Sequence, residues 1–210
     1  MKQELSSTIL NILRETYGHV EPGLHYKNLY QLLISVVLSA QTTDKQVNTV
    51  TPVLFQEYPD FQSLAHAEIA DIEIIIKSTG FYRNKAKNIV MLSRMILSKY
   101  NGIVPDALED LTFLPGVGRK SAQVVRAFGF GIPAIPVDTH VMRVSKRIGY
   151  TTSTNPVEVE RALALMIAEE YWIESHVLFI THGRHICVSR KPLCDSCPIY
   201  RYCDFVNNNP

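Results

Sequence analysis

The chain has 210 residues, of which 46% are apolar and 20% charged, so it can build one large domain or two small ones and is not disordered. Its formal net charge is only +1, which excludes an argument for nucleic-acid binding from overall charge. The N-terminus lacks the apolar core of a secretory signal, and no apolar run is long enough to span a bilayer. We therefore expect a cytoplasmic protein with no membrane partner.

Apolar residues recur at helical spacing along almost the whole chain, and no alternating run is long enough to indicate a sheet. Ile89, Leu92 and Ile96, for example, fall on one helix face. Asp44 is expected to cap the helix that follows it. The prediction is an all-α protein. Its expected helices, in chain order, cover Leu5–Tyr17, Tyr26–Leu38, a segment after Asp44, Ala67–Lys77, Asn84–Tyr100, Asn155–Tyr171 and Ser175–His182.

A turn signal rich in glycine and proline, 115–118, lies between helical segments and reads PGVG. Gly116 and Gly118 allow backbone conformations that are closed to other residues, and they let the backbone approach a ligand closely. The helix that Gly118 opens presents N–H groups that can hold a phosphate. From this pattern alone, an ordinary corner between two helices is an equally good interpretation.

Lys120 falls in the first turn of the helix after this hairpin, next to Arg119. For an arbitrary lysine, contact with a phosphate would be the expected role. However, the positive end of the helix dipole and the charge of Arg119 both disfavour an ammonium group at this place. They therefore favour the neutral amine that Schiff-base chemistry requires, and Lys120 becomes a candidate nucleophile.

Asp138 lies 18 residues after Lys120, between an apolar stretch and Thr139. The common role of an aspartate at such a place is the N-cap of a helix. A carboxylate beside a sugar can also stabilise oxocarbenium character and assist the deprotonation of an attacking amine. The residues alone leave both roles open.

Basic residues gather in the segment 119–147, which contains six of them against a single acid. Solvated helix faces can also produce such a cluster. Because the cluster coincides with the hairpin, it favours a face that binds DNA.

All four cysteines lie in the last 24 residues, with the spacing Cys187-x6-Cys194-x2-Cys197-x5-Cys203. A disulfide scaffold would scatter its cysteines and would need an oxidising compartment, so the crowding indicates a metal centre. From the spacing alone, a structural zinc ion and an iron–sulfur cubane, in which each iron takes one thiolate, are about equally favoured.

The strings LPGVGRKSA, VDTH and HGRHICVSRKPLCDSCPIYRYC together resemble the endonuclease III family of the helix-hairpin-helix DNA glycosylase superfamily. The resemblance covers nearly the whole chain. It implies a two-lobed helical DNA glycosylase fold with a helix-hairpin-helix and a C-terminal [4Fe–4S] loop. The expected lobes are a six-helix lobe over 21–132 and a cluster lobe that combines 1–20 with 133–210.

The resemblance also implies an activity, that of a bifunctional DNA N-glycosylase and AP lyase that removes oxidised pyrimidines by base flipping. Lys120 would be the nucleophile and Asp138 the acidic partner. The partner would be double-stranded DNA with a damaged pyrimidine or an abasic site, so the protein would be nucleoid-associated, and a monomer is the default. A [4Fe–4S] cluster in a structural role would be ligated by Cys187, Cys194, Cys197 and Cys203.

Further DNA contacts follow from positions that match the family. Gln41 in SAQTTD and Phe81 in TGFYRNKA would fill the gap left by a flipped base, although relatives commonly carry leucine at the second place. Without the resemblance, Phe81 would be interpreted as a core residue and His140 as a satisfied residue at a helix start. The remaining expected contacts are Gly116, Gly118, Arg119, His140, Arg190 and Lys191.

Three other functions are compatible with parts of the pattern. A related glycosylase for mismatched adenine or thymine is disfavoured by Lys120, because such relatives generally lack the hairpin lysine. A non-catalytic helix-hairpin-helix module is disfavoured by Asp138 at the family spacing. An iron–sulfur electron carrier would have no use for the hairpin.

Overall fold

The computed structural model describes residues 2–20 and 22–207, and these residues form helices and connections without a strand. The all-α prediction is therefore confirmed. No helix in these ranges combines the length and apolar character that crossing a membrane requires. The α-helices are α1 (Lys2–Tyr17), α2 (Leu29–Leu38), α3 (Asp44–Glu57), α4 (Phe61–His66), α5 (Ile69–Ile75), α6 (Tyr82–Tyr100), α7 (Leu108–Phe113), α8 (Arg119–Phe130), α9 (Thr139–Ile148), α10 (Pro156–Met166), α11 (Trp172–His185) and α12 (Asp204–Asn207).

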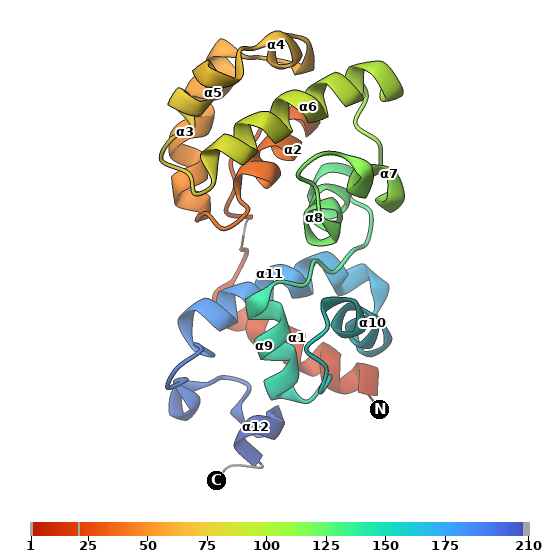
Figure 1. Cartoon of the computed structure of the whole chain (residues 1–210). Helices are drawn as coiled ribbons and strands as arrows, with labels where there is room; N and C mark the ends of the chain where they lie inside the picture. The colour runs from red at the N-terminus through yellow and green to blue at the C-terminus, as the bar shows by residue number, and fades with distance from the viewer. Residues whose placement is uncertain (1, 21, 208–210) are drawn as a thin grey trace. The chain divides into compact units, whose positions relative to one another are not determined.

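The chain divides into two compact units, and each is described by itself. One unit spans Pro22–Ile132 and contains α2 to α8, and the other combines Met1–Glu21 with Pro133–Pro210 and contains α1 and α9 to α12 (Figure 1). The first unit, all of which is described, has seven α-helices where six were expected. The segment after α3 is split into α4 and α5 by extended backbone at Ala67 and Glu68.

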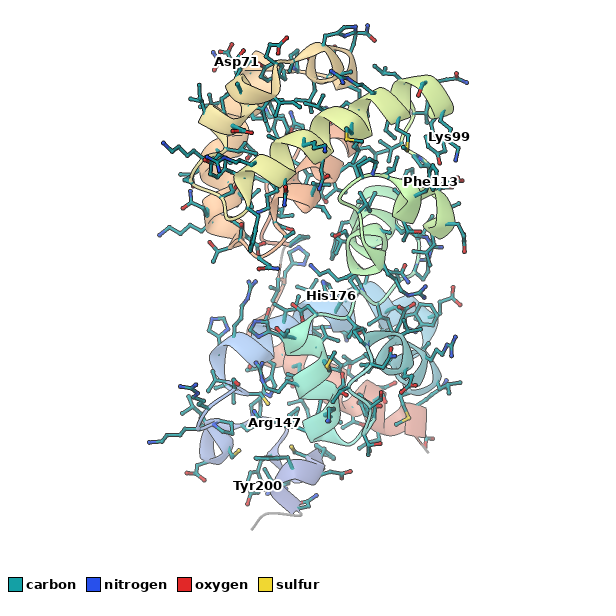
Figure 2. The ribbon with its side chains drawn as sticks, viewed as in Figure 1. Asp71, Lys99, Phe113, Arg147, His176 and Tyr200 are labelled. Atoms are coloured by element: carbon teal, nitrogen blue, oxygen red, sulfur yellow. The ribbon has the colours of Figure 1, made fainter. Side chains whose placement is uncertain are left out.

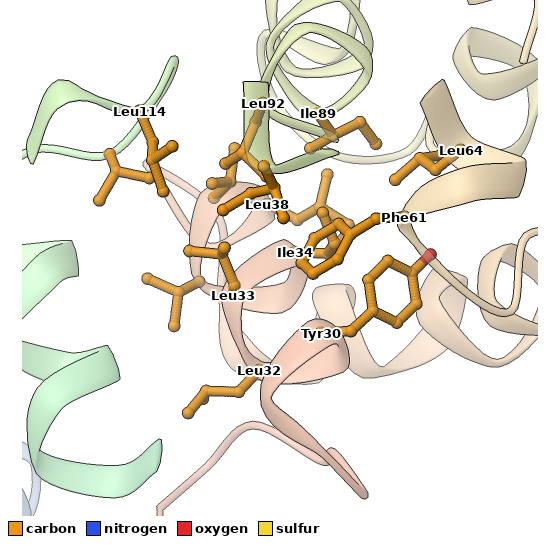
Figure 3. Close-up of a cluster of buried hydrophobic side chains, with 14 of the residues drawn as sticks. Tyr30, Leu32, Leu33, Ile34, Leu38, Phe61, Leu64, Ile89, Leu92 and Leu114 are labelled. Carbon is orange, nitrogen blue, oxygen red and sulfur yellow. The ribbon is translucent and has the colours of Figure 1, made fainter. Parts of the chain in front are cut away.

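The unit 22–132 is built around α2, whose side chains are buried on all sides. Leu33, Ile34 and Leu38 are fully buried, and helices α3, α6 and α8 pack on α2 (Figure 3). A ten-residue helix that is apolar all round belongs in a core. Because α2 ends at Leu38, the chain emerges at the surface after it, and Ala40 and Gln41 are exposed.

Polar caps set the starts of the helices in this unit. Asn28 accepts a hydrogen bond from the Gln31 amide, so α2 begins three residues later than the predicted Tyr26. Thr43, and not Asp44, caps α3, because its hydroxyl accepts from the Gln46 amide. The predicted cap at Asp44 is thus wrong by one residue, and Asp44 is the first residue of the helix.

In the second unit, α11 is the central helix and packs against α1 and α9. Phe179 on α11 and Leu13 on α1 are fully buried in its core. Arg14 and Glu174 join α1 to α11 by two hydrogen bonds of 2.6 Å each. His176 of α11, labelled in Figure 2, is buried, and its Nδ1 lies 2.7 Å from the Pro136 carbonyl oxygen. That contact holds the segment of backbone that leads into α9.

Candidate active site and metal centre

The predicted hairpin connects α7 to α8. Leu114 and Val117 are buried, and the Val117 amide donates to the Leu114 carbonyl at 3.1 Å, so the turn is anchored to the core. Gly116 has φ +80°, and a Cβ there would lie 2.9 Å from Asn88 Nδ2 and 3.1 Å from Val37 Cγ1. Both the backbone conformation and the available space therefore require glycine at position 116.

Gly118 has a different function in the turn. Its φ of −85° and ψ of 173° are open to any residue, so the expectation of a special backbone conformation is wrong here. It is the N-cap of α8, makes no side-chain cap, and a Cβ there would meet nothing within 4 Å. The absence of a side chain thus keeps the surface at the start of α8 open.

Lys120 and Arg119 lie in the first turn of α8, and both side chains are exposed. The first intrahelical bond of α8 joins the Ala122 amide to the Gly118 carbonyl, so the preceding amides have no partner in this helix. Within the ranges that the structure describes, the Lys120 ammonium group contacts no carboxylate. The amine is therefore accessible to a substrate.

Asp138 is the N-cap of α9 and is half-buried. Its Oδ1 accepts a hydrogen bond of 2.8 Å from the Val141 amide. Oδ2 has no hydrogen-bond partner among the described residues. The two roles that the sequence left open are thus compatible, because one oxygen holds the helix while the other remains able to accept a proton.

His140 lies one turn away from Arg143 on α9. The Arg143 guanidinium donates to His140 Nδ1 at 3.1 Å and to the Gly183 carbonyl at 2.8 Å. Since a guanidinium can only donate, Nδ1 must be the acceptor and Nε2 carries the proton. A Cβ at Gly183 would lie 3.1 Å from His140 Nδ1, so glycine on α11 makes room for the ring. His140 is therefore held as a donor through Nε2.

Gln41 and Phe81, the two residues expected to fill the space of a flipped base, share an unusual backbone conformation. Both are in the left-handed region, with φ 53° and 58°, although neither is glycine. Both are exposed, and Phe81 exposes 64% of its surface. The alternative interpretation of Phe81 as a core residue is therefore wrong.

All four cysteines line one pocket in the second unit. None of them forms a disulfide. No three His, Cys, Asp or Glu side chains in the described ranges gather closely enough to hold a single metal ion. Burial raises the pKa of Cys197 to about 11 and also raises that of Cys203, so the metal-free chain keeps these thiols protonated.

Arg147, labelled in Figure 2, connects the end of α9 to the loop that carries the first cysteine. Its guanidinium donates to Cys187 Sγ at 3.3 Å and to the Val188 carbonyl at 2.8 Å. The Cys203 thiol donates to the Arg147 carbonyl at 3.1 Å. Two members of the basic cluster predicted over 119–147, Arg143 and Arg147, thus donate hydrogen bonds to other groups of the protein.

Arg190 and Lys191 form the tip of the loop between the first two cysteines. Both are exposed, and Lys191 has φ +53°. The loop is closed at its base by a hydrogen bond of 3.0 Å from the Leu193 amide to the Ile186 carbonyl. The two basic side chains therefore project from a loop with a fixed base.

Residues 34–169 match the HhH-GPD superfamily of base excision DNA repair proteins. The chain belongs to this superfamily. It is 46% identical to endonuclease III of Synechocystis sp. over 96% of this chain and 93% of that protein, and 44% identical to endonuclease III of Bacillus subtilis over 92% and 89%. The resemblance to the endonuclease III family is therefore confirmed, and the chain is an HhH-GPD enzyme of the DNA glycosylase and AP lyase class.

Solved structures of HhH-GPD proteins agree with this assignment. A trapped covalent intermediate of endonuclease III with DNA matches with a TM-score of 0.92 and 42% identity, over 99% of this chain and 98% of that one. A thermostable thymine-DNA glycosylase matches with a TM-score of 0.85 and 25% identity, over 99% and 97%. The predicted DNA glycosylase fold is therefore confirmed.

Sequence reasoning missed several residues that organise the HhH-GPD site. Arg143 was assigned only to a basic cluster, and its pairing with His140 has an i, i+3 spacing that could have indicated it. His182, buried between Tyr17 and Cys197, was part of the motif string but received no role. Lys85 carried no signal at all, because an isolated lysine in a helical pattern is expected to be solvated.

Proposed function

We propose that this enzyme removes oxidised pyrimidines from duplex DNA and then cleaves the strand, with Lys120 as the nucleophile and Asp138 as its acid/base partner. The observation that carries the proposal is the exposed Lys120 amine in the first turn of α8, directly after the glycine hairpin. A hydrolytic glycosylase needs only a carboxylate and water at this step. A reactive amine adds the chemistry of an imine, which links base release to strand cleavage.

The neutral Lys120 amine attacks C1′ of the damaged nucleotide, and the N-glycosidic bond breaks. The electron pair of that bond leaves with the base, which takes up a proton from solvent. The new ammonium group on Lys120 gives a proton to Asp138. The C1′–O4′ bond then opens: O4′ takes its electron pair and receives that proton back from Asp138, and the nitrogen lone pair forms the protonated imine. Loss of a proton from C2′ then expels the 3′ phosphate, which is β-elimination.

Asp138 is suited to this task because its two carboxylate oxygens have different surroundings. Oδ1 is held at 2.8 Å by the Val141 amide, so the carboxylate is fixed in orientation. Oδ2 is left to stabilise positive charge on the sugar and to accept the proton. A helix start is also a place where a negatively charged side chain interacts favourably with the helix dipole.

The proposed DNA contacts divide into those that hold the backbone and those that replace the flipped nucleotide. Gln41 and Phe81 are exposed on loops of one unit and suit the second task, because a flipped base leaves an apolar gap in the stack. His140 can donate to a phosphate through Nε2. The remaining proposed backbone contacts are Gly116, Gly118, Arg119, Arg190 and Lys191.

We further propose that Cys187, Cys194, Cys197 and Cys203 ligate a [4Fe–4S] cluster. The donor set fits, because four unpaired thiols line a single pocket with apolar walls that include Val144, Ile148 and Ile199. When bound, the cluster would supply a rigid anchor in which each iron takes one thiolate. Arg147 would hold the Cys187 sulfur through its hydrogen bond, and the loop with Arg190 would gain a fixed position.

A lesion panel tests the substrate. We expect single-turnover base release from duplexes with thymine glycol or another oxidised pyrimidine to be at least about 100-fold faster than from duplexes with a T·G mismatch, the substrate of the rival glycosylase. Strand cleavage should accompany base release and should be lost in Lys120→Gln. If the mismatch were processed faster, or if cleavage survived in Lys120→Gln, the proposed substrate or nucleophile would be wrong.

A further inference from the structure

The unit 22–132 contains a buried lysine that the chemistry described above does not use. Lys85 on α6 exposes only 4% of its surface, although lysine is almost never fully buried without a partner of opposite charge. No carboxylate among the described residues pairs with it. Burial lowers the pKa of its ammonium group. An unpaired buried cation has a cost in stability, so its presence calls for a function.

The contacts of Lys85 reach both loops that are proposed to enter the DNA. Its Nζ donates to the Thr42 hydroxyl at 2.7 Å, next to Gln41. Thr42 in turn donates to the Ala40 carbonyl at 3.4 Å, on the other side of Gln41. The backbone amide of Lys85 donates to the Phe81 carbonyl at 3.1 Å. The Lys85 side chain thus reaches the Gln41 loop through the Thr42 hydroxyl, while its backbone amide makes the first hydrogen bond of α6, to the N-cap residue Phe81.

The same two loops also touch directly. A Cβ placed on Gly80 would lie 3.4 Å from the Gln41 carbonyl oxygen and 3.7 Å from Thr42 Oγ1. The backbone just before Phe81 therefore lies close to the backbone at Gln41. A second link, from Gln46 Nε2 to Ser78 Oγ at 2.7 Å, joins the helix after one loop to the turn before the other.

Backbone strain explains why such links are needed. Gln41 and Phe81 both occupy the left-handed region, which is strained for a non-glycine residue and persists only where the surroundings enforce it. A hydrogen bond from a cation is stronger than one between neutral groups. The Lys85–Thr42 bond is therefore well suited to hold the Gln41 loop in its strained conformation beside Phe81.

We propose that Lys85 is a positioning residue that fixes the Gln41 loop against the Phe81 loop, so that both side chains enter the duplex together. This inference rests on the proposed roles of Gln41 and Phe81. Lys85 itself is buried and does not contact DNA. Its effect is on the space vacated by the flipped nucleotide and on the base opposite to it.

The test uses the complete protein with its metal centre and a duplex that carries a tetrahydrofuran abasic analogue opposite 2-aminopurine. The fluorescence of 2-aminopurine rises when that base is unstacked by an inserted side chain. We expect Lys85→Met to lower the fluorescence of the saturated complex at least twofold and to weaken binding to this duplex about tenfold, while binding to undamaged duplex is unchanged. Lys87→Met is the matched control, because Lys87 is an exposed lysine on the same helix.

Thr42 provides an independent arm that leaves the buried charge in place. Thr42→Val should lower the 2-aminopurine fluorescence as Lys85→Met does, whereas Thr42→Ser should retain wild-type fluorescence. The double variant Lys85→Met/Thr42→Val should have a fluorescence no lower than that of either single variant. If Lys85→Met does not fold, the contrast between valine and serine at position 42 decides. Wild-type fluorescence in the folded Lys85→Met and Thr42→Val variants, even with a lower Tm, would overturn the inference.

Failure of the underlying assignment gives a different result. Phe81→Ala and Gln41→Ala should each lower the 2-aminopurine fluorescence if these side chains fill the duplex. No change in either variant would remove their proposed role, and with it the function of Lys85. A loss in Phe81→Ala together with wild-type behaviour in Lys85→Met and Thr42→Val would overturn the inference alone and leave the proposed function intact.

Discussion

Asp138 combines a structural and a chemical function in one carboxylate. Oδ1 caps α9 through the Val141 amide, and Oδ2 is left without a partner among the described residues. Asparagine caps helices as well as aspartate does, but it cannot take a proton. We therefore predict that Asp138→Asn lowers single-turnover base release by about 100-fold or more while the free energy of unfolding changes by only a few tenths of a kcal/mol.

Alanine at the same position separates the two functions. Asp138→Ala removes the cap as well as the carboxylate and should lower the free energy of unfolding by about 1 kcal/mol in a urea titration. Its base release should be as slow as that of Asp138→Asn. If Asp138→Asn released base at the wild-type rate, Asp138 would be a cap and nothing more.

The buried charge of Lys85 predicts a distinct pH dependence of stability. Its pKa in the folded chain is lowered by burial, whereas the unfolded chain titrates near 10.5. Below the folded pKa, both states carry the proton and the cost of burying the charge is fully present. Between the two pKa values the unfolded chain binds more protons, so the stability of the folded state rises with pH.

The free energy of unfolding of the wild type should therefore increase, relative to that of Lys85→Met, as the pH rises from 7 toward 10. Urea titrations of both proteins at three pH values measure this difference, and Lys87→Met corrects for general effects of losing a lysine. A wild-type free energy of unfolding that falls relative to that of Lys85→Met as the pH rises would show that the ammonium group is stabilised in the folded chain, contrary to its burial without a carboxylate.

The two glycines of the hairpin between α7 and α8 differ in backbone conformation and in the space around them. Gly116 has φ +80° and no space for a Cβ, whereas Gly118 has an ordinary backbone and open space. We predict that Gly116→Ala lowers the free energy of unfolding by about 2 kcal/mol, from backbone strain and crowding against Asn88 and Val37. Gly118→Ala should cost about 0.5 kcal/mol.

Relative to its small loss of stability, Gly118→Ala should lower DNA affinity more than Gly116→Ala does. In Gly118→Ala, a nearly intact fold would present a methyl group at the start of α8, so any loss of affinity reports contact between the backbone and DNA. Equal losses of stability in the two alanine variants, measured by chemical denaturation, would contradict the difference between their backbone conformations.

Helical periodicity found the long helices of this chain but not their ends. The Asn84–Tyr100 prediction is close to the observed α6, because its apolar stripe is long and regular. The predicted start of α2 was three residues early and the cap of α3 was off by one, since several polar residues near each start can act as the cap. The six-residue helices α4 and α7 are too short to show a period and were not predicted.

For the whole molecule, the motif strings placed Lys120 and Asp138 correctly at the starts of two helices, because glycine, proline and aspartate mark such starts in any sequence. The hydrogen bonds from Arg143 to His140 and Gly183, and the burial of Lys85, were out of reach of the sequence. They depend on which side chains from separate helices meet after packing, and no local spacing encodes that.

Removing a ligand of the proposed iron–sulfur cluster tests the organisation of the second unit. Within 187–207 the regular structure consists of two short 3-10 turns and a four-residue helix, and Cys203 is hydrogen-bonded to Arg147. This segment should therefore depend on its four thiols. We predict that Cys203→Ser lowers the iron content and raises amide exchange throughout 187–207, while the unit 22–132 keeps its protection. Hydrogen exchange with iron analysis checks this, and unchanged protection in 187–207 would contradict it.

Borohydride trapping shows whether the Lys120 amine forms a covalent bond with the sugar, because borohydride reduces an imine to a stable amine. The protein is incubated with a duplex that contains one thymine glycol, reduced, and mapped by mass spectrometry, beside Lys120→Ala and the exposed-lysine control Lys87→Met. We predict a covalent complex at Lys120 in the wild type and in Lys87→Met, and none in Lys120→Ala. Base release without any trapped complex in the wild type would contradict the claim, because water would then be the nucleophile.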